Sequence, residues 1–320
     1  MPRLKLSTIP KSLSTHLFSP TLTSFLPSPS TATSTTGPPT CTTPPTTSFQ
    51  ILSDLHLEAS QTPPNTYETF HIPPRAPYLL LAGDIGLLTP SHYPRYLHFL
   101  TAHVHKFRQI FLILGNHEFY HQSRDEALRA AARLESERAL EGRVQVLYRR
   151  VVEVSVRVGG GEEEEVVCIL GATLNTHVPE EAAAEVAARV QDFRMIKGWS
   201  VDAHNRAFRE DVEWLKTAVA GLRRGRKAVI VTHHAPVVGG TSKSVFEGSS
   251  VASAFATDVV GEVLTAGGGE GVGTWVFGHT HFSVDFWVKW KRGRVRLVAN
   301  QRGYFGEDEA GFDVGLVVGV

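Results

Sequence analysis

Five apolar segments of this sequence each run directly into residues that can bind metal ions. The polar strings that follow them are Ser53-Asp54-Leu55-His56, Gly83-Asp84, Gly115-Asn116-His117-Glu118, Thr232-His233-His234 and Gly278-His279-Thr280-His281. Carboxylate oxygens, an amide oxygen and imidazole nitrogens form a mixed donor set that suits zinc, iron or manganese better than magnesium. Each string alone is common, but five of them at the ends of apolar segments indicate one metal-binding cleft.

The apolar segments have the pattern of β-strands. Strands covered on both faces are apolar at consecutive positions, and this pattern occurs at 49–53, 78–82, 110–114, 166–171, 228–232 and 274–277. More alternating patterns predict further strands at 144–148, 151–158, 284–291 and 294–300. Ligands in open α/β sheets bind beyond the carboxyl ends of strands, so the polar strings are expected to meet there. Gly83, Gly115 and Gly278 are expected to relieve crowding where the chain turns into the cleft.

Helical patterns lie between the predicted strands. Ser123 and Glu126 form a capping-box pattern that predicts a helix extending to about Leu140. Apolar residues at helical spacing predict further helices over about 202–220 and around 97–107. The glutamate-rich stretch 159–165 is expected to be a hairpin tip with solvated side chains. The alternation of strands and helices predicts one layered α/β domain over residues 48–320.

Residues 1–47 are rich in Ser, Thr and Pro and keep neither a strand nor a helix period. We expect a disordered tail, because such a composition cannot bury enough apolar area to fold. A mitochondrial transit peptide is the alternative, since acidic residues are absent and Ile9, Leu13 and Leu17 have helical spacing. Pro10 and Pro20 limit the length of any such helix.

The charge of the chain is balanced. Lys plus Arg and Asp plus Glu each total 32 in 320 residues. This balance gives no whole-chain attraction for nucleic acid or acidic membranes, and no apolar stretch is long enough to span a bilayer. Two cysteines, Cys41 and Cys168, are too few for a disulfide framework or a cysteine-based zinc cluster. We expect an intracellular, cytoplasmic protein, with mitochondrial import as the alternative.

The polar strings also support a resemblance to a known family. DLH at 54–56, GDIG at 83–86, GNHE at 115–118, THH at 232–234 and GHTH at 278–281 resemble the five sequence blocks of the calcineurin-like metallophosphoesterase superfamily. The similarity covers about residues 49–304, and the flanking segments resemble a poorly characterised single-domain branch. It implies two facing mixed β-sheets flanked by helices, in four α-β-β-α layers, with the metals at one edge.

The resemblance assigns roles to individual residues. It implies a first metal ion held by Asp54, His56 and His281, a second held by Asn116, His233 and His279, and a bridging carboxylate from Asp84. His117 matches the proton donor of the family. His233 is preferred to His234 as the ligand because it directly follows the strand. The implied reaction is hydrolysis of a phosphomonoester or phosphodiester by a water or hydroxide that bridges two ions of Mn, Fe or Zn.

Departures from well-known subfamilies narrow the expected substrate. Leu88 stands where protein phosphatases have a phosphate-binding arginine, and Leu87 stands where purple acid phosphatases have a tyrosine. We therefore expect a small phosphate ester, with no membrane or nucleic-acid partner. The alternative is a non-catalytic scaffold that keeps the fold for partner binding, although such scaffolds usually lose ligands and none is missing here.

Other polar residues have less specific interpretations. Glu118 is expected to orient a neighbouring group, or simply to begin the next loop. Asn175 and His177 could line the substrate entrance or be solvated, and Arg302 could contact phosphate or form a structural salt bridge. The remaining histidines of a helical stretch are interpreted as surface or packing residues: His92, His98, His103 and His105.

Overall fold

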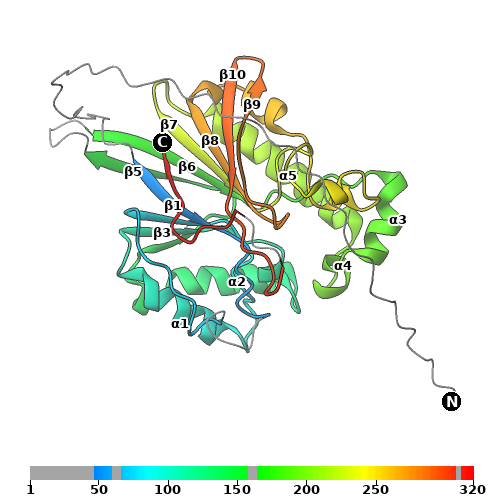
Figure 1. The fold of residues 1–320 in the computed structure, drawn as a ribbon, viewed down its shortest axis with the longest axis horizontal. Coiled ribbons are helices and arrows are strands. Elements are labelled where there is room, and N and C mark those ends of the chain that lie inside the picture. Colours follow the sequence, from blue (N-terminus) through cyan, green and yellow to red (C-terminus); the bar gives the residue numbers. More distant parts are fainter. Residues whose placement is uncertain (1–46, 60–65, 158–163, 308–310) are drawn as a thin grey trace, which may run out of the picture. The chain divides into compact units, whose positions relative to one another are not determined.

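A computed structural model describes residues 47–59, 66–157, 164–307 and 311–320, which belong to one compact unit, Thr43–Val320. The expected tail and the hairpin tip fall mostly outside the described residues, so both stay predictions. Within the unit, two β-sheets face each other, and helices cover their outer faces (Figure 1).

The first sheet has the strand order β11-β1-β2-β3-β4. Neighbouring strands from β1 to β4 run parallel, and β11 pairs antiparallel with β1. Their bounds are β1 Ser48–Leu52, β2 Tyr78–Leu81, β3 Gln109–Leu112, β4 Val144–Val146 and β11 Val317–Gly319. The parallel arrangement places the carboxyl ends of β1, β2 and β3 at one edge of the sheet.

The second sheet has the strand order β5-β6-β7-β8-β10-β9. Strands β6, β7, β8 and β10 run parallel, and the outer strands β5 and β9 pair antiparallel with β6 and β10. Their bounds are β5 Arg150–Arg157, β6 Glu164–Ala172, β7 Lys227–Thr232, β8 Val272–Phe277, β9 Val284–Trp290 and β10 Gly293–Ala299. The carboxyl ends of β7 and β8 carry the later polar strings.

Six α-helices and five short 3-10 turns connect the strands of the described residues. The α-helices are α1 Tyr93–Val104, α2 Arg124–Glu135, α3 Glu180–Arg189, α4 Asp192–Met195, α5 Val201–Ala220 and α6 Val260–Thr265. The 3-10 turns are His117–Phe119, Arg138–Leu140, Ser244–Phe246, Ala252–Ala254 and Gly269–Gly271. Helices α1 and α2 lie on the first sheet and α5 on the second (Figure 1).

Three hydrophobic clusters hold the layers together. One cluster, which includes Phe49, Phe111 and Val229, contains side chains from both sheets and forms the layer between them. A second packs α1 and α2 against the first sheet, and a third packs α5 and α6 against the second. The burial of consecutive positions in β2 is the result expected for a strand covered on both faces. The four-layer α-β-β-α prediction is confirmed.

The predicted strands are all present, and two helices have other bounds than predicted. The helix expected around 97–107 is α1, which begins at Tyr93 and ends at Val104, before Phe107. The capping box is formed as expected, because the Ser123 hydroxyl accepts from the backbone N–H of Glu126 and the Glu126 carboxylate accepts from that of Ser123. The prediction that this helix reaches Leu140 is wrong, since α2 ends at Glu135. Glu137 is extended, and the following 3-10 turn buries Leu140 in the core. Strand β11 and helices α3, α4 and α6 were not predicted.

Two predictions from composition can be compared with the described residues. Cys168 is unpaired and buried in β6, where it packs as a small apolar side chain. Across the described part of the chain, no helix is both long and apolar enough to cross a membrane.

Candidate metal centre

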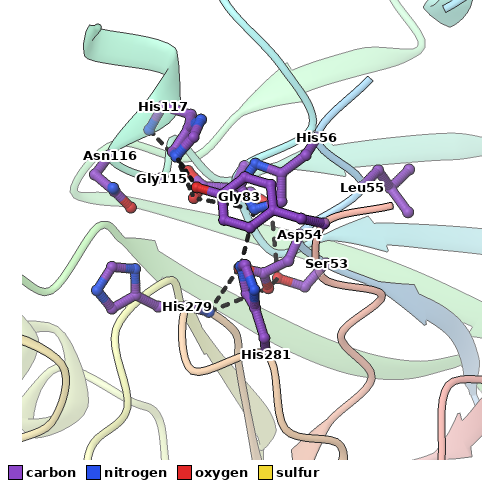
Figure 2. A network of polar contacts seen from close by, with 12 residues as sticks. Ser53, Asp54, Leu55, His56, Gly83, Gly115, Asn116, His117, His279 and His281 are labelled. Atoms are coloured by element: carbon purple, nitrogen blue, oxygen red, sulfur yellow. Dashed lines mark hydrogen bonds and ion pairs between the residues drawn. The ribbon is translucent and has the colours of Figure 1, made fainter. Parts of the chain in front are cut away.

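The polar strings follow β1, β2, β3, β7 and β8, and the structure brings them together at one edge of the two sheets. Figure 2 shows Asn116 and His117 arriving from one segment, and His279 and His281 from another, around Asp54 and His56. The backbone links the strands here, since the N–H of Asp54 donates to the carbonyl of Gly83 at 3.0 Å. The N–H of His279 donates to both carboxylate oxygens of Asp54, at 3.0 and 3.1 Å.

The first expected ligand set forms one cluster. Asp54, His56 and His281 place one donor atom each within 4.8 Å of one another. The Nε2 atoms of His56 and His281 are 2.9 Å apart, and that of His281 lies 3.6 Å from Oδ1 of Asp54. Two ring nitrogens and a carboxylate oxygen at this spacing are better suited to binding a cation than to hydrogen bonding with one another.

The second cluster contains Asp84, His233 and His279, again within 4.8 Å. Nε2 of His233 lies 3.4 Å from Oδ2 of Asp84 and 2.9 Å from Oδ1 of Asn116. Nε2 of His279 is buried and has no hydrogen-bond partner among the described residues. A buried nitrogen without a partner costs free energy, so a cation that accepted its lone pair would remove that cost.

Asn116 is oriented by two neighbours. Its Nδ2 donates to Oδ1 of Asp192 at 2.9 Å and to the hydroxyl of Tyr120 at 3.0 Å. Tyr120 also donates to Asp192, at 2.7 Å. A carboxylate only accepts hydrogen bonds, so the amide nitrogen must face Asp192 and the amide oxygen must face His233. The oxygen that a metal would use therefore points into the centre.

The two consecutive histidines have different surroundings. Nδ1 of His233 lies 2.9 Å from the carbonyl of Ala82, which directs its Nε2 toward Asp84. Nδ1 of His234 lies 3.5 Å from the carbonyl of Thr173, and its ring packs 4.1 Å from that of His279. The geometry favours His233 as the ligand, and His234 belongs to none of the three donor clusters found among the described residues.

Backbone strain is concentrated at this edge of the sheets. Five of the seven expected ligand residues have positive φ: Asp54 (55°), His56 (45°), Asp84 (53°), His279 (75°) and His281 (48°). A left-handed conformation costs a non-glycine residue about 1–3 kcal/mol and persists only where the surroundings impose it. Such strain is typical of a functional site.

The predicted crowding at glycines is present. A Cβ atom at Gly115 would overlap the carboxylate of Asp84 and the ring of His233. A Cβ atom at Gly278 would overlap the Ser53 hydroxyl and the carboxylate of Asp54. These positions keep a side chain from displacing the donors.

Glu118 holds the backbone beneath Asp84. Its fully buried carboxylate accepts from the N–H groups of Gly115, Asp84 and Ile85, at 2.8, 3.0 and 2.9 Å. The hydroxyl of Tyr96 donates to it at 3.1 Å. Burial and the charge of Asp84 raise the pKa of Glu118 to about 7, while the backbone donors act in the opposite direction. Glu118 therefore orients the loop that carries Asp84.

His117 lies between two hydrogen-bond partners. Its Nδ1 is 2.7 Å from Oε1 of Glu58, and its Nε2 is 3.0 Å from the hydroxyl of Tyr304. The backbone N–H of His117 donates to Oδ1 of Asp84 at 2.8 Å. Nε2 also lies 3.9 Å from Oδ2 of Asp84, and His117 forms a third possible donor cluster with His56 and Asp84.

Charge in the centre is organised around Asp84. Burial raises the pKa of Asp84, but the imidazoles of His233, His117 and His56 outweigh burial and hold it well below its usual value. Burial lowers the pKa of His233, but the carboxylate of Asp84 outweighs this effect and raises the pKa to about 10. Protons and cations compete for these nitrogens, so metal affinity is expected to rise with pH.

A sequence comparison assigns the family. The model of the calcineurin-like phosphoesterases matches residues 48–283. The chain belongs to the calcineurin-like phosphoesterase family. Proteins of this family typically bind divalent metal ions, and the His and Asp clusters described above provide suitable donors. Membership supports a hydrolase activity.

One solved structure has a similar fold over most of this chain, and two others match it at lower TM-scores. Phosphopantetheinyl hydrolase from Mycobacterium tuberculosis is 18% identical, with a TM-score of 0.60 over 80% of this chain and 89% of that one. The 5'-nucleotidase precursor from Thermus thermophilus is 18% identical, with a TM-score of 0.41 over 79% of this chain and 48% of that one. This chain thus spans about half the length of the nucleotidase precursor. GAP50, the anchor in the inner membrane complex of Plasmodium, is 12% identical, with a TM-score of 0.47 over 83% of this chain and 75% of that one. No curated protein matches. At 18% identity, the similarity to the phosphopantetheinyl hydrolase shows the fold alone.

The less specific interpretations have mixed outcomes in this calcineurin-like phosphoesterase. Asn175 is buried and donates to Asp211 at 3.2 Å, so its contacts are structural. His177 is exposed. Arg302 is buried, donates to the carbonyl of Leu55 at 3.2 Å and lies over the ring of Phe70. The other histidines match their prediction: His98 and His105 are exposed, His92 is half-buried, and His103 packs in the core.

Sequence reasoning missed the residues that surround the expected ligands of this phosphoesterase. Glu58 follows His56 by two positions, so its proximity was a signal that could have been used. Tyr304 lies in the NQRGY string, but nothing there predicts its contact with His117. Asp192 and Glu307 approach from distant segments, and no local pattern identifies them.

Proposed function

We propose that this chain is a dinuclear metal-dependent phosphoesterase that hydrolyses a small phosphomonoester or phosphodiester. The observation that supports this most directly is the position of Asp84, whose carboxylate shares one donor cluster with His56 and His117 and another with His233 and His279. Its Oδ2 lies 3.8 Å from Nε2 of His56 and 3.4 Å from Nε2 of His233. A carboxylate between two donor sets can bridge two ions. The proposed ligands are Asp54, His56 and His281 for the first ion, Asn116, His233 and His279 for the second, and Asp84 for both.

Mn, Fe or Zn ions bound by these residues would lower the pKa of a water molecule and neutralise charge on the phosphoryl oxygens. The chain itself supplies the proton donor. Burial lowers the pKa of His117, but the carboxylates of Asp84 and Glu58 outweigh burial and raise it to about 9. The imidazolium form is therefore favoured in the metal-free chain, and Nε2 is the nitrogen that would protonate the leaving oxygen.

The test combines metal analysis with hydrolysis assays. The full chain is loaded with Mn, Fe or Zn, and bound metal is counted by mass spectrometry. Hydrolysis is then measured with p-nitrophenyl phosphate and bis(p-nitrophenyl) phosphate. Asp84→Asn is expected to lower kcat/KM about 10³-fold, because several kcal/mol of transition-state stabilisation depend on the two metal ions that Asp84 would bridge. His117→Ala is expected to lower it about 10²–10⁴-fold with an alkyl phosphate ester, whose leaving group requires a proton, and less with the two p-nitrophenyl esters.

Asp202→Asn is the matched control, because Asp202 is an exposed aspartate in the first turn of α5. It should retain wild-type metal content and activity. Two bound ions with no hydrolysis of either ester, or an active Asp84→Asn variant, would contradict the proposal. A chain that holds no metal and hydrolyses neither ester would support the scaffold alternative.

The expected location of the protein stays part of this proposal. We place it inside the cell, in the cytoplasm, with mitochondrial import as the alternative if residues 1–47 are a targeting segment. A fusion of residues 1–47 to a fluorescent reporter would distinguish the two locations.

A further inference from the structure

One buried carboxylate lies behind two imidazoles that have different proposed roles. Oε1 of Glu58 is 2.7 Å from Nδ1 of His117 and 3.4 Å from Nδ1 of His56. The side chain of Glu58 is 8% exposed, and its Oε2 has no hydrogen-bond partner among the described residues. Both hydrogen bonds therefore enter the same carboxylate oxygen.

The hydrogen bonds to Glu58 determine which ring nitrogen of His56 and of His117 faces the candidate metal centre. A carboxylate only accepts hydrogen bonds, so Nδ1 of both imidazoles must carry the hydrogen that faces Glu58. Nε2 of His56 is then left with its lone pair toward the first donor cluster, 2.9 Å from Nε2 of His281. Nε2 of His117 lies 3.9 Å from Oδ2 of Asp84, on the side where an ester would bind. Partners of this kind fix both the tautomer and the ring orientation.

We propose that Glu58 is a positioning residue that serves metal binding and proton delivery through one carboxylate. It holds His56 as a metal ligand and His117 as the proton donor. In the step it assists, a hydroxide oxygen forms a new bond to phosphorus as the P–O bond to the leaving group breaks, and the electron pair of the broken bond stays on the leaving oxygen. That oxygen takes the Nε2 proton of His117, while the Nδ1 proton stays on the ring and remains bonded to Glu58. The inference rests on the proposed function.

Glu307 provides a matched comparison within the same site. Its Oε2 lies 2.7 Å from Nδ1 of His281, so it supports a proposed metal ligand in the same way. Its carboxylate also accepts from the N–H of Tyr304 at 3.1 Å, but among the described residues no contact joins it to His117. Removing Glu307 should disturb one ligand, whereas removing Glu58 should disturb a ligand and the proton donor together.

The experiment compares Glu58→Leu, Glu58→Gln and Glu307→Leu in the metal-loaded full chain. Leucine removes the acceptor from a buried position, and glutamine keeps a neutral acceptor. Activity is measured with phosphate esters whose leaving groups range from p-nitrophenol through phenol to an alkyl alcohol. A poor leaving group needs the proton most, so Glu58→Leu should lose about 10²-fold more activity with the alkyl ester than with the p-nitrophenyl ester. Glu58→Gln should recover part of this loss, and Glu307→Leu should lose the same factor with every ester.

A second measurement does not depend on activity. In protein labelled with ¹⁵N in its imidazoles, NMR at pH 10.5, where the imidazole of His117 is neutral, should show the Nδ1–H tautomer at His56 and His117 in the wild type and in Glu307→Leu. Glu58→Leu should lose this tautomer preference at His117. Equal losses across the ester series, or unchanged tautomers in Glu58→Leu, would overturn the inference. If Glu58→Leu does not fold, the same two criteria apply to Glu58→Ala, which also lacks the acceptor. A wild type that hydrolyses no ester would contradict the proposed function, and the tautomer measurement would still decide the role of Glu58.

Discussion

Glu118→Gln is expected to destabilise the domain strongly while changing its volume very little. The carboxylate of Glu118 uses both oxygens to hold the loop after β2. Oε2 accepts from the N–H groups of Gly115 and Asp84, at 2.8 and 3.0 Å. Oε1 accepts from the N–H of Ile85 at 2.9 Å and from the hydroxyl of Tyr96 at 3.1 Å. A glutamine has only one acceptor oxygen, so its NH₂ group must face backbone donors on one side.

The expected loss follows from those contacts. With the amide oxygen toward Ile85, two buried N–H groups, those of Gly115 and Asp84, oppose the amide nitrogen. Each buried donor left without an acceptor costs about 1–3 kcal/mol, so the free energy of unfolding should fall by about 2–6 kcal/mol. For a domain of this size, the melting temperature should fall by about 2 °C per kcal/mol.

Urea denaturation at pH 8, followed by far-UV circular dichroism in EDTA, measures this loss without any contribution from bound metal. This pH lies above the raised pKa of Glu118, so the wild-type side chain is ionised. Glu181→Gln is the control, because Glu181 is exposed in the first turn of α3, and its change should stay within about 0.5 kcal/mol. A Glu118→Gln variant as stable as this control would refute the role assigned to the carboxylate.

Three further predictions follow from individual contacts. Asp192→Leu removes the acceptor that orients Asn116. It should weaken metal binding at one of the two sites about 10–100-fold, as measured by isothermal titration calorimetry. A variant that binds metal at both sites as tightly as the wild type would contradict this prediction. Ser123→Ala removes the N-cap of α2 and should cost about 1 kcal/mol in urea denaturation, with Ser249→Ala, in a loop, as the comparison. Burial lowers the pKa of His204 to about 3, so the unfolded state binds the proton more readily. Above pH 6.5 the imidazole of His204 is neutral in both states and does not lower the free energy of unfolding. As pH falls toward 3, only the unfolded state binds the proton, so the free energy of unfolding decreases, by about 2 kcal/mol between pH 6.5 and pH 5. His204→Gln should flatten that part of the stability profile, and an unchanged slope would count against the assignment.

Sequence patterns predicted the strands and the convergence of the polar strings, because both follow from residues that are neighbours in the sequence. Apolar runs such as that of β2 define buried parallel strands, and residues such as Asp84 occupy the carboxyl ends of these strands. The helix starting at Arg124 was predicted from its capping box, but its end was not. Burial of Leu140 depends on the core beneath it, which the local sequence does not encode.

The residues that orient the expected ligands were beyond the reach of local patterns. Asp192 meets Asn116 across 76 positions, and Tyr304 meets His117 across 187. A carboxylate or hydroxyl at such a distance looks like any other polar residue in the sequence. Glu58 was the exception, since it lies beside a predicted ligand and only its contact with His117 is long-range.

Strand β11 has a consequence for the synthesis of the protein. It pairs with β1, so the strand that leads into Asp54 has β2 on one side and residues 317–319 on the other. The ribosome adds about 5–20 residues per second, so roughly 15–50 s separate the emergence of these partners. During that interval β1 has an exposed, unpaired edge, which is a template for association with other chains. Nascent chains of this protein should therefore depend on chaperones until translation has passed residue 319.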